Sequence, residues 1–357
     1  MAREHFGSRM GVLLAMAGGA VGLGNMWRFP YLVGKNGGAA FILVYLLFVV
    51  FLCLPILVSE YALGRRTQKN AFGAFKMLSK NKSWSLIGIF AVLAAVCVLS
   101  FYCVVGGWSV KYLVESCKFN MPILDSSYFT GFISSSFAPV IYTLIFLALT
   151  GSVLVLGIQK GIERFSKVMM LLLCLLIILI AIRSVTLPGA MEGMKYLFVP
   201  NLNALNGKAL LEALGQSFFS LSIGCGTVLT YASYVSKKEN IITTSFMIAA
   251  FDTLFALVAG IAIIPAVFAI AYMNGATPEI GAGPGLVFIT LPSVFNAMPM
   301  GNIVAILFFV TLLIAAITSA ISLMETFVTY EIEEWKLSRT KSVLLAFAIC
   351  SVLGIIC

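Results

Sequence analysis

The residues of this chain that are best placed to bind a ligand form a glycine-rich run from Gly18 to Asn25, inside the first long apolar stretch. Four of the seven residues from Gly18 to Gly24 are glycines, and each glycine in a helix interior costs about 1 kcal/mol relative to alanine. Within a bilayer, irregular backbone persists only where it is buried in protein or lines a wet cavity. Carbonyls freed at such a break can bind a cation, and freed amides can bind an anion. The run therefore predicts a binding site in a broken helix.

A second interruption of this kind lies in a later apolar stretch, from Ser220 to Gly226. It places two serines and two glycines in the middle of segment 209–234. One break alone is explained equally well by glycines that let helices pack closely. Broken helices at corresponding positions in two halves of a chain are the best sequence indication of a transporter site at the bilayer midplane. We therefore expect the two breaks to form one site.

The composition indicates which elements hold these two runs. Of the 357 residues, 61% are hydrophobic and 10% are charged, and the mean hydropathy is +1.05, whereas a soluble domain carries about 25% charged residues. Apolar stretches of about 20 residues form membrane-spanning helices. The chain is therefore predicted to be an all-α polytopic membrane protein. Its apolar segments are 10–33, 38–63, 86–114, 138–157, 166–187, 209–234, 241–273, 301–331 and 342–357.

Two regions depart from this pattern of spanning segments. Residues 275–300 contain several prolines and glycines, so we predict a loop with short helical pieces that serves as a lid. The last segment, 342–357, has only 16 residues and is shorter than the about 20 that a spanning helix needs. We therefore expect a C-terminally truncated chain whose second half is incomplete.

The net charge of +9 reports membrane topology and not a nucleic-acid partner. If the helices alternate in direction, 16 of the 23 Lys and Arg residues lie on one side. Cytoplasmic loops are rich in Lys and Arg, so the N-terminus is predicted to be cytoplasmic. The eight cysteines have no spacing typical of disulfides or metal sites, and His5 is the single histidine. The basic residues on that side are Arg3, Arg9, Arg65, Arg66, Lys69, Lys76, Lys80, Lys82, Lys160, Arg164, Lys167, Lys237, Lys238, Lys336, Arg339 and Lys341.

Three motifs make the chain similar to the neurotransmitter:sodium symporter family, in particular to its bacterial sodium-dependent amino-acid transporters. They are Gly22-Leu23-Gly24-Asn25-Met26-Trp27-Arg28-Phe29-Pro30-Tyr31, Lys160-Gly161-Ile162-Glu163-Arg164-Phe165 and Thr230-Tyr231-Ala232-Ser233-Tyr234. The resemblance implies an inverted repeat of five plus five helices, with the first and sixth helices broken. This chain would supply eight full helices and part of a ninth as one domain, 1–357, with the first repeat in 1–187 and an incomplete second repeat in 208–357.

The resemblance also implies a first sodium site made by the carbonyl of Ala20 and the side chains of Asn25, Ser220 and Asp252. Relatives often carry Asn where Asp252 stands, and some of them need chloride to balance the charge nearby. An acid inside a membrane helix is costly unless it is paired or ligating. Because Asp252 would supply the negative charge itself, chloride is not expected. The alternative is an Asp that faces a wet cavity without metal.

A second sodium site is implied by the same resemblance. It would combine the carbonyls of Gly18, Val21 and Ala315 with the hydroxyls of Thr318 and Ser319. On the residues alone, such hydroxyls in a membrane helix usually bond back to their own helix. The matched break in the first helix favours the interpretation as ligands.

The substrate implied by the resemblance is a zwitterionic amino acid. Its carboxylate would meet the amides of Leu23 and Gly24, at the start of a half-helix, and its side chain would fill an enlarged pocket. Gly19 and Cys225 are smaller than the Asn and Phe of the leucine-selective relative at these positions, although an apolar lining is more often plain core. The expected substrate-binding residues are Gly19, Ala20, Gly22, Leu23, Gly24, Val98, Tyr102, Phe219, Ser220, Ser222, Cys225, Ser319 and Leu323.

Gating residues are implied on both sides of this site. Arg28 would lie just outside the site, at an outer gate whose acidic partner is in a tenth helix. Phe101 and Tyr102 would help to form an aromatic lid with Phe219. On the inner side Arg3 would pair with Glu333, beside Ser233 and Tyr234. The alternative for Arg3 is ordinary positive-inside topology. An exposed pair contributes about 0–1 kcal/mol, so its role would be that of a switch.

A departure from the family concerns the fifth helix. Relatives often carry a proline ten residues after the glycine that matches Gly161, and that proline helps the helix unwind and release the inner sodium. Here the position is Leu171. Unwinding is therefore expected to be harder, or to depend on Gly161 alone.

These residues together indicate sodium-coupled symport of a neutral, hydrophobic or aromatic amino acid by alternating access, in a bacterial inner membrane, with no enzymatic activity. The alternative is a truncated, transport-inactive membrane protein that retains only ligand binding or assembly. A dinucleotide-binding enzyme would need a strand–turn–helix unit around the glycine run, which the apolar flanks exclude. The amino acid, the sodium stoichiometry, self-association, and whether the chain ending at Cys357 is a fragment all stay open.

Overall fold

The computed structural model describes residues 4–118, 126–278, 283, 285–297 and 300–356, and these form helices joined by turns. Seven helical stretches within them are long and apolar enough to cross a membrane. The prediction of a polytopic all-α membrane protein is therefore confirmed. The seven stretches are Ala39–Thr67, Ser85–Ser116, Ala138–Val155, Ile158–Val185, Ile241–Met273, Gly301–Glu334 and Arg339–Ile356.

Two further apolar segments are interrupted, as the sequence predicts. The first consists of α1 (Arg9–Ala20), a π-helical turn η1 (Gly24–Arg28) and α2 (Phe29–Lys35), with a bend of 49° between the two halves. The other consists of α11 (Gly207–Ser220) and α12 (Thr227–Ala232), separated by residues 221–226. With α1–α2 as a single span, up to eight helices in the described chain could cross a membrane.

The remaining elements are continuous with these spans or connect them. The spans are α3 (Ala39–Phe48), η2 (Val49–Cys53), α4 (Leu54–Thr67), α6 (Ser85–Ser116), α8 (Ala138–Val155), η4 (Ile158–Glu163), α9 (Arg164–Val185), α13 (Ile241–Met273), α15 (Gly301–Glu334) and α16 (Arg339–Ile356). The connecting elements are α5 (Ala71–Leu78), η3 (Lys82–Trp84), α7 (Ser126–Ile133), α10 (Ala190–Phe198), η5 (Leu202–Ala204), η6 (Leu286–Thr290) and α14 (Leu291–Ala297).

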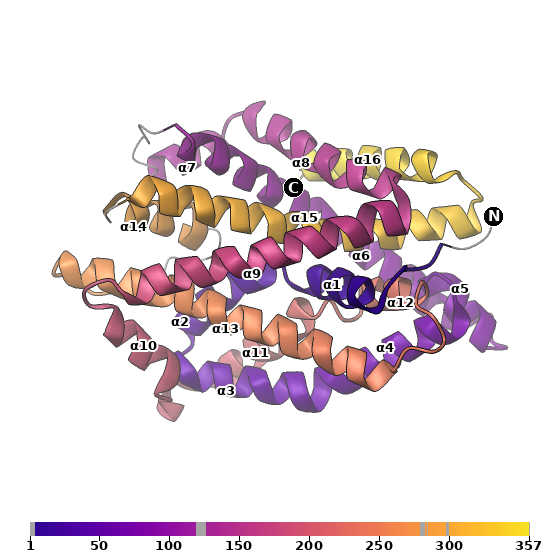
Figure 1. Ribbon diagram of the computed structural model, residues 1–357, viewed down its shortest axis with the longest axis horizontal. Coiled ribbons are helices and arrows are strands. Elements are labelled where there is room, and N and C mark those ends of the chain that lie inside the picture. The colour runs from indigo at the N-terminus through magenta and orange to yellow at the C-terminus, as the bar shows by residue number, and fades with distance from the viewer. Residues whose placement is uncertain (1–3, 119–125, 279–282, 284, 298–299, 357) are drawn as a thin grey trace.

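The long helices run along the long axis of the molecule and define two ends (Figure 1). One end holds α5, the start of α9 and the ends of α4, α12 and α15, and we call it the α5 end. The opposite end holds α7, α10 and α14, and we call it the α7 end. Segments rich in Lys and Arg meet at the α5 end, as the charge pattern predicts. The short helices η6 and α14 confirm the helical pieces expected in the described part of 275–300.

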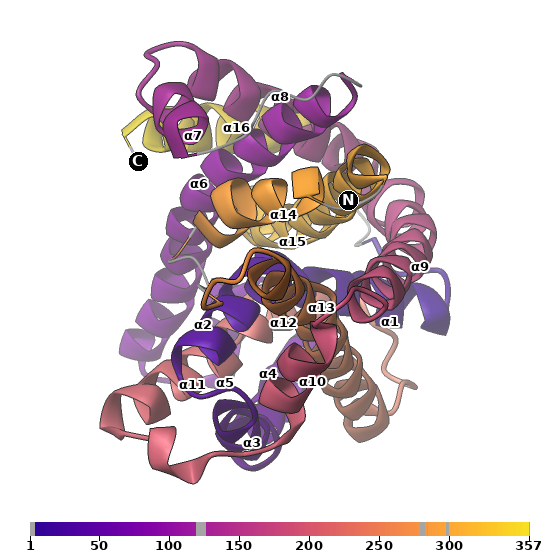
Figure 2. The ribbon, with the colours of Figure 1, turned by 90° about the vertical axis from the view of Figure 1, so that its left-hand side faces the viewer.

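Seen from the α7 end, the broken helices and α13 lie beside α15, which is flanked by α6 and α9, whereas α8 and α16 lie together on one side (Figure 2). Small residues allow this close packing. A Cβ on Gly107 of α6 would lie 2.6 Å from the backbone nitrogen of Thr143 in α8, so the two backbones touch there. The helices of the described chain thus pack closely around the two breaks.

The last helix begins earlier than the apolar pattern predicts. It starts at Arg339 instead of residue 342 and has 18 residues, enough by length and composition to cross a membrane. Hydropathy places the boundary later because Arg339 and Lys341 are charged. The expectation that this segment is too short to span is therefore corrected.

Candidate functional site

The two breaks lie against each other in the centre of the bundle. At the first break the chain leaves α1 with Val21 in an extended conformation (φ −71°, ψ 111°) and re-enters a helix at Gly24. At the second break Ser222, Gly224 and Gly226 have positive φ values of 52°, 86° and 70°. The hydroxyl of Ser222 donates to the carbonyl of Gly19 at 3.3 Å across the gap. The two breaks are therefore in direct contact.

Three of the residues expected at the first sodium site form one buried polar cluster. The amide nitrogen of Asn25 donates to Asp252 Oδ1 at 2.8 Å and to Ser220 Oγ at 3.1 Å. The hydroxyl of Ser220 donates to Asp252 Oδ2 at 2.7 Å. All three side chains are buried, and every donor to Asp252 in the described structure is neutral. The carbonyl expected from Ala20 belongs to the last residue of α1. A buried carboxylate with neutral partners favours a cation as ligand.

The residues expected at the second sodium site also lie together, between α1 and α15. Ser319 Oγ donates to the carbonyl of Val21 at 3.0 Å and to that of Gly18 at 3.4 Å, so it bridges the two helices. Thr318 Oγ1 donates to the carbonyls of Ile314 and Ala315 in its own helix, at 3.0 and 3.1 Å. In this conformation Thr318 therefore makes the intrahelical bonds typical of membrane hydroxyls, while Ser319 occupies the space between the carbonyls.

A cavity of about 270 Å³ adjoins both breaks. Tyr102 of α6 accepts a hydrogen bond on its hydroxyl from the amide of Leu23 at 2.9 Å, which places the phenol at the start of η1. Nine expected substrate-binding residues line the cavity, and Gly215, Phe218 and Ile223 line it without having been predicted. The nine are Ala20, Gly24, Val98, Tyr102, Phe219, Ser222, Cys225, Ser319 and Leu323.

The other four expected residues lie behind this lining. Gly19 borders a neighbouring space of only about 10 Å³, and Ser220 belongs to the cluster around Asp252. Gly22 is closely surrounded, since a Cβ there would lie 2.3 Å from Ser319 Oγ and 2.5 Å from the Tyr102 hydroxyl. Leu23 is fully buried and contributes its amide. Gly19, Gly22 and Leu23 therefore present backbone to the site, whereas Ser220 presents its hydroxyl to Asp252.

One acidic residue at the second break escaped the sequence analysis. Glu60 of α4 accepts a hydrogen bond from the amide of Gly224 at 2.8 Å, so it holds the irregular backbone beside Cys225. Its other carboxylate oxygen is buried without a partner among the described residues. The signal was present, because an acid within the apolar segment 38–63 is costly unless it has a partner. The same reasoning identified Asp252.

On the side of the cavity towards the α7 end, Arg28 lies over the ring of Phe219, with 5.2 Å between the guanidinium carbon and the ring centroid. Its Nη1 donates to Gln216 Oε1 at 2.7 Å, and Gln216 in turn donates to the carbonyl of Gly24 at 3.0 Å. Gln216 was not predicted. Phe101 is 41% exposed and pairs with the ring of Trp27 at 6.0 Å, outside the cavity lining. Of the three aromatic residues expected in the lid, Tyr102 and Phe219 line the cavity and Phe101 does not.

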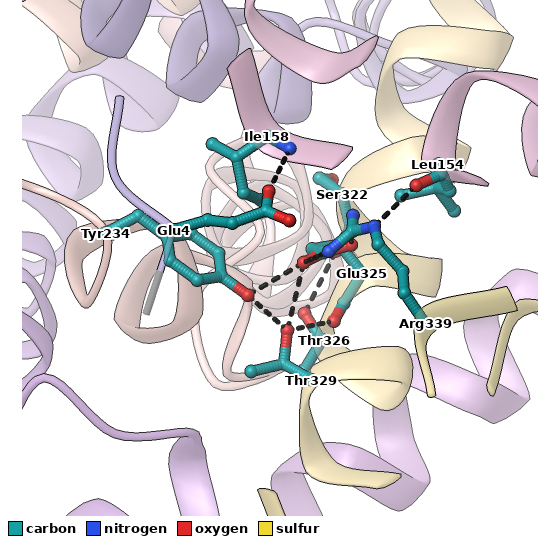
Figure 3. A network of polar contacts seen from close by, with 9 residues as sticks. All are labelled: Glu4, Leu154, Ile158, Tyr234, Ser322, Glu325, Thr326, Thr329 and Arg339. Carbon is teal, nitrogen blue, oxygen red and sulfur yellow. Dashed lines mark hydrogen bonds and ion pairs between the residues drawn. The ribbon is translucent and has the colours of Figure 1, made fainter. Parts of the chain in front are cut away.

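Towards the α5 end a buried ionic network closes the bundle (Figure 3). Glu325 of α15 is fully buried and accepts hydrogen bonds from Tyr234 Oη at 2.7 Å and from Arg339 Nη2 at 2.7 Å. Arg339 Nε also donates to the carbonyl of Leu154 at 2.6 Å. Thr329 Oγ1 lies 2.6 Å from the Tyr234 hydroxyl. The network joins α8, the turn that follows α12, α15 and α16, and of its side chains only Tyr234 was predicted as a site residue.

The expected pair between Arg3 and Glu333 cannot be placed, because Arg3 lies outside the described residues. Glu333 accepts hydrogen bonds from the backbone and side-chain nitrogens of Asn70, at 2.9 and 2.8 Å. It lines a cavity of about 790 Å³ at the α5 end together with Tyr234 and Arg339. Ser233 is buried and donates to the carbonyl of Thr230 at 2.5 Å. Glu333 and Ser233 thus lie next to the network around Glu325.

Gly161 and Leu171 lie in different environments. Gly161 is part of the π-helical turn η4, and a Cβ there would lie 2.1 Å from the carbonyl oxygen of Val153. Leu171 is 67% exposed on α9, which continues as a regular helix past it. The irregular turn therefore lies at the start of this span, around Gly161, without a proline.

Comparison with known proteins is consistent with this geometry. The Sodium:neurotransmitter symporter family matches residues 3–138 and 135–357. The chain is 41% identical to the uncharacterized sodium-dependent transporter YhdH of Bacillus subtilis over 350 residues, 96% of this chain and 76% of that protein. An uncharacterized sodium-dependent transporter of Haemophilus influenzae is 36% identical over 99% of this chain and 79% of its own length.

A solved structure matches along nearly the whole chain. The crystal structure of MhsT in complex with L-phenylalanine superimposes with a TM-score of 0.90 at 42% identity, covering 99% of this chain and 80% of that one. The match confirms the inverted-repeat transporter fold with its broken first and sixth helices. On fold, family match and identity together, this chain is a multi-pass membrane protein that belongs to the sodium:neurotransmitter symporter family of sodium-dependent transporters.

Proposed function

We propose that this protein carries a neutral, hydrophobic or aromatic amino acid into the cell together with sodium, by alternating access. The observation that carries the proposal is the cavity between the two breaks, which is bounded by the Leu23 amide and Tyr102 on one side and adjoins the cluster around Asp252. Its volume of about 270 Å³ is close to the lower end, about 300 Å³, of small-molecule sites. The related MhsT was crystallised with L-phenylalanine.

In this proposal the cavity separates the charged and apolar parts of the substrate. The carboxylate meets the Leu23 and Gly24 amides at the start of η1, where the helix dipole favours an anion, and the Tyr102 hydroxyl lies at the same point. Val98, Ile223, Cys225 and Leu323 give the remaining wall an apolar character. The amine is left to the carbonyls of Ala20, Phe219 and Ser220.

Sodium is a co-substrate at two sites in this proposal. One ion binds at Ala20, Asn25, Ser220 and Asp252, and the other at Gly18, Val21, Ala315, Thr318 and Ser319. The carboxylate of Asp252 neutralises the first ion, so transport proceeds without chloride. Ions and substrate stabilise the conformations to different extents, which couples their movements. The positively charged α5 end faces the cytoplasm of a bacterial cell, and the Glu325 network is then the inner gate.

Uptake of radiolabelled phenylalanine, leucine and glycine into proteoliposomes tests this proposal. Sodium-dependent accumulation is expected for phenylalanine and leucine, and none for glycine, with equal rates in chloride and gluconate. The variant Asp252→Asn is compared with the wild type in the same assay, because it changes the proposed first sodium site with little change in shape. Binding of phenylalanine without uptake would instead support a transport-inactive binding protein. An uptake rate that does not depend on the sodium gradient would contradict the proposal.

A further inference from the structure

Glu331, three residues before the end of α15, is a buried acid that takes no part in the site described above. It is 0% exposed, and neither of its carboxylate oxygens has a hydrogen-bond partner among the described residues. Glu325, six residues earlier on the same helix, is equally buried but accepts hydrogen bonds from Tyr234 and Arg339. Because buried polar groups almost always have a partner, the carboxyl group of Glu331 must be stabilised in another way.

Glu331 lies at the joint between α15 and α16. The polar side chain that it faces is Ser342 of α16, whose hydroxyl is also buried without a partner in the described chain. Cys350, further along α16, is the second group of this helix that interacts with Glu331. Water is close, because α15 ends at Glu334 and the next residue, Trp335, is 50% exposed. The carboxyl group is thus enclosed by helix packing, yet it lies about one helical turn from solvent.

The described chain offers Glu331 no cation. Arg339, the first residue of α16, is bound by the carboxylate of Glu325 and by the carbonyl of Leu154. No charged group among the described residues is close enough to interact with the Glu331 carboxylate. An ionised carboxylate here would therefore lack both a counter-charge and a hydrogen-bond donor.

The titratable groups on the neighbouring elements are exposed, uncharged or bound elsewhere. Lys76 of α5, Cys97 of α6, Arg164 of α9, Lys336 and Lys341 are exposed, and residues 143–155 of α8 hold no titratable side chain. Glu333 and Glu334 of α15 accept hydrogen bonds from Asn70, and Lys167 of α9 pairs with Glu163. The remaining groups are the phenols of Tyr231 and Tyr330 and the thiol of Cys103, and such groups carry no charge at neutral pH.

A buried acid in these surroundings is stable only in its neutral form. An isolated ion in an apolar interior is so costly that the group neutralises instead. A proton achieves this with one bond, the O–H bond of the carboxylic acid, and the proton comes from water. A metal ion would need about six oxygen ligands, whereas the one side-chain oxygen that faces Glu331 in the described chain is that of Ser342. An ionisable group inside a membrane helix with no partner is a candidate for proton binding.

We propose that Glu331 is a proton-binding site, and that α16 docks on α15 only while the proton is bound. Loss of the proton breaks the O–H bond, passes the proton to water and leaves a buried charge that draws water into the joint. Because docking of α16 places Arg339 at Glu325, the bound proton also stabilises the closed network at the α5 end.

The sign of the pH dependence follows from the number of protons bound. The docked state holds one proton more than an undocked state in which Glu331 is hydrated and loses its proton near pH 4.3, the ordinary value of about 4.3 for Glu. The docking equilibrium therefore weakens by up to about tenfold for each pH unit above that value, until Glu331 ionises in the docked state as well. The proton site does not depend on the proposed function, but the statement that cytoplasmic pH acts on it rests on that function.

Infrared difference spectroscopy on the full-length protein tests proton binding directly. At neutral pH the spectrum of the wild type minus that of Glu331→Gln should contain the carbonyl band of one protonated carboxylic acid. Glu192→Gln is the matched control, because its pair with Lys195 is exposed at 60–64%, and this substitution should remove only the band of an ionised carboxylate. The band of an ionised carboxylate for Glu331 at neutral pH would overturn the proposal.

Thermal melts at about pH 6 and pH 8 test the link between the proton and helix docking. The folding equilibrium of the wild type should weaken by up to about a hundredfold more than that of Glu331→Gln, which has no proton to lose. Glu331→Leu is the second variant, and at pH 8 it should be at least as stable as the wild type, because an apolar side chain suits a position without hydrogen bonds. Glu192→Gln should follow the wild type.

An equal loss of stability in the wild type and in Glu331→Gln would contradict the docking step. Strong destabilisation by Glu331→Leu at pH 8 would likewise show that the carboxyl group makes bonds that a proton site does not need. If the wild type shows no sodium-dependent uptake, the proposed function fails, but the spectra and the melts still decide the proton site, because neither measurement requires transport.

Discussion

Replacing Asp252 by Asn removes the negative charge from the proposed first sodium site with almost no change in shape. A unit charge about 4 Å from the ion contributes about 4 kcal/mol at an effective dielectric constant of about 20. The amide oxygen of Asn keeps part of this attraction, which leaves a loss of about 2–3 kcal/mol, or a sodium affinity about 30- to 150-fold weaker. The neighbouring donors, Asn25 and Ser220, stay in place.

Equilibrium phenylalanine binding as a function of sodium concentration measures this loss. In the variant the titration should shift to higher sodium in gluconate, and part of the shift should be reversed in chloride, since an anion can replace the missing charge. The wild type should titrate equally in both salts. Melting without sodium is the control for folding, and the variant should be at least as stable because a buried charge is gone. A sodium affinity within about threefold of the wild type, less than 1 kcal/mol, would refute the assignment of Asp252.

Three further predictions follow from contacts around the cavity and the network. Tyr102→Phe removes the hydroxyl that would donate to the substrate carboxylate beside the Leu23 amide, so phenylalanine binding, measured by calorimetry at saturating sodium, should weaken by about 1–3 kcal/mol. Gly22→Ala should abolish phenylalanine binding, because the added Cβ would overlap Ser319 and Tyr102. Gly215→Ala should be tolerated, since the nearest atom to its added Cβ is an Arg28 nitrogen at 3.7 Å. Equal effects of the two substitutions would contradict this prediction. Glu325→Gln leaves Arg339 buried without its ion pair, which should destabilise the protein by about 3–5 kcal/mol in thermal melts; an unchanged melting temperature would contradict the buried ion pair.

The fold and most of the cavity were accessible from the sequence because their signals are local. Hydropathy identifies spanning helices wherever about 20 apolar residues follow one another. Glycines interrupt these helices in the same run that the structure leaves non-helical, between Ala20 and Gly24. Serines and glycines mark the other break in the same way. Nine of the expected substrate-binding residues line one cavity. Those at the breaks follow from this local signal, whereas Val98, Tyr102, Ser319 and Leu323 were expected only from the resemblance to the family.

The missed residues are those whose meaning depends on a partner far away in the chain. Glu60 acquires a role only when α4 lies beside Gly224, and Glu325 only when Arg339 reaches it from the next helix. Each could have been noticed as an acid in an apolar segment, where burial is costly without a partner. Which partner it finds is a matter of helix packing, which no local pattern contains. The early start of α16 also depends on packing, since Arg339, its first residue, forms an ion pair with the buried Glu325.

What the sequence by itself determined is the kind of protein: a bundle of membrane helices with two breaks, one family, and a set of backbone and side-chain groups suited to a cation and a zwitterion. Only the tertiary structure decided which of these groups form hydrogen bonds with one another. Asp252 accepts hydrogen bonds from Asn25 and Ser220, and Glu163 accepts one from the amide of Gly7. The physical reason is that a buried carboxylate must be satisfied by whichever donors packing brings near. The amide of Gly7, for example, lies 156 residues away in the chain from the carboxylate of Glu163 that accepts its hydrogen bond.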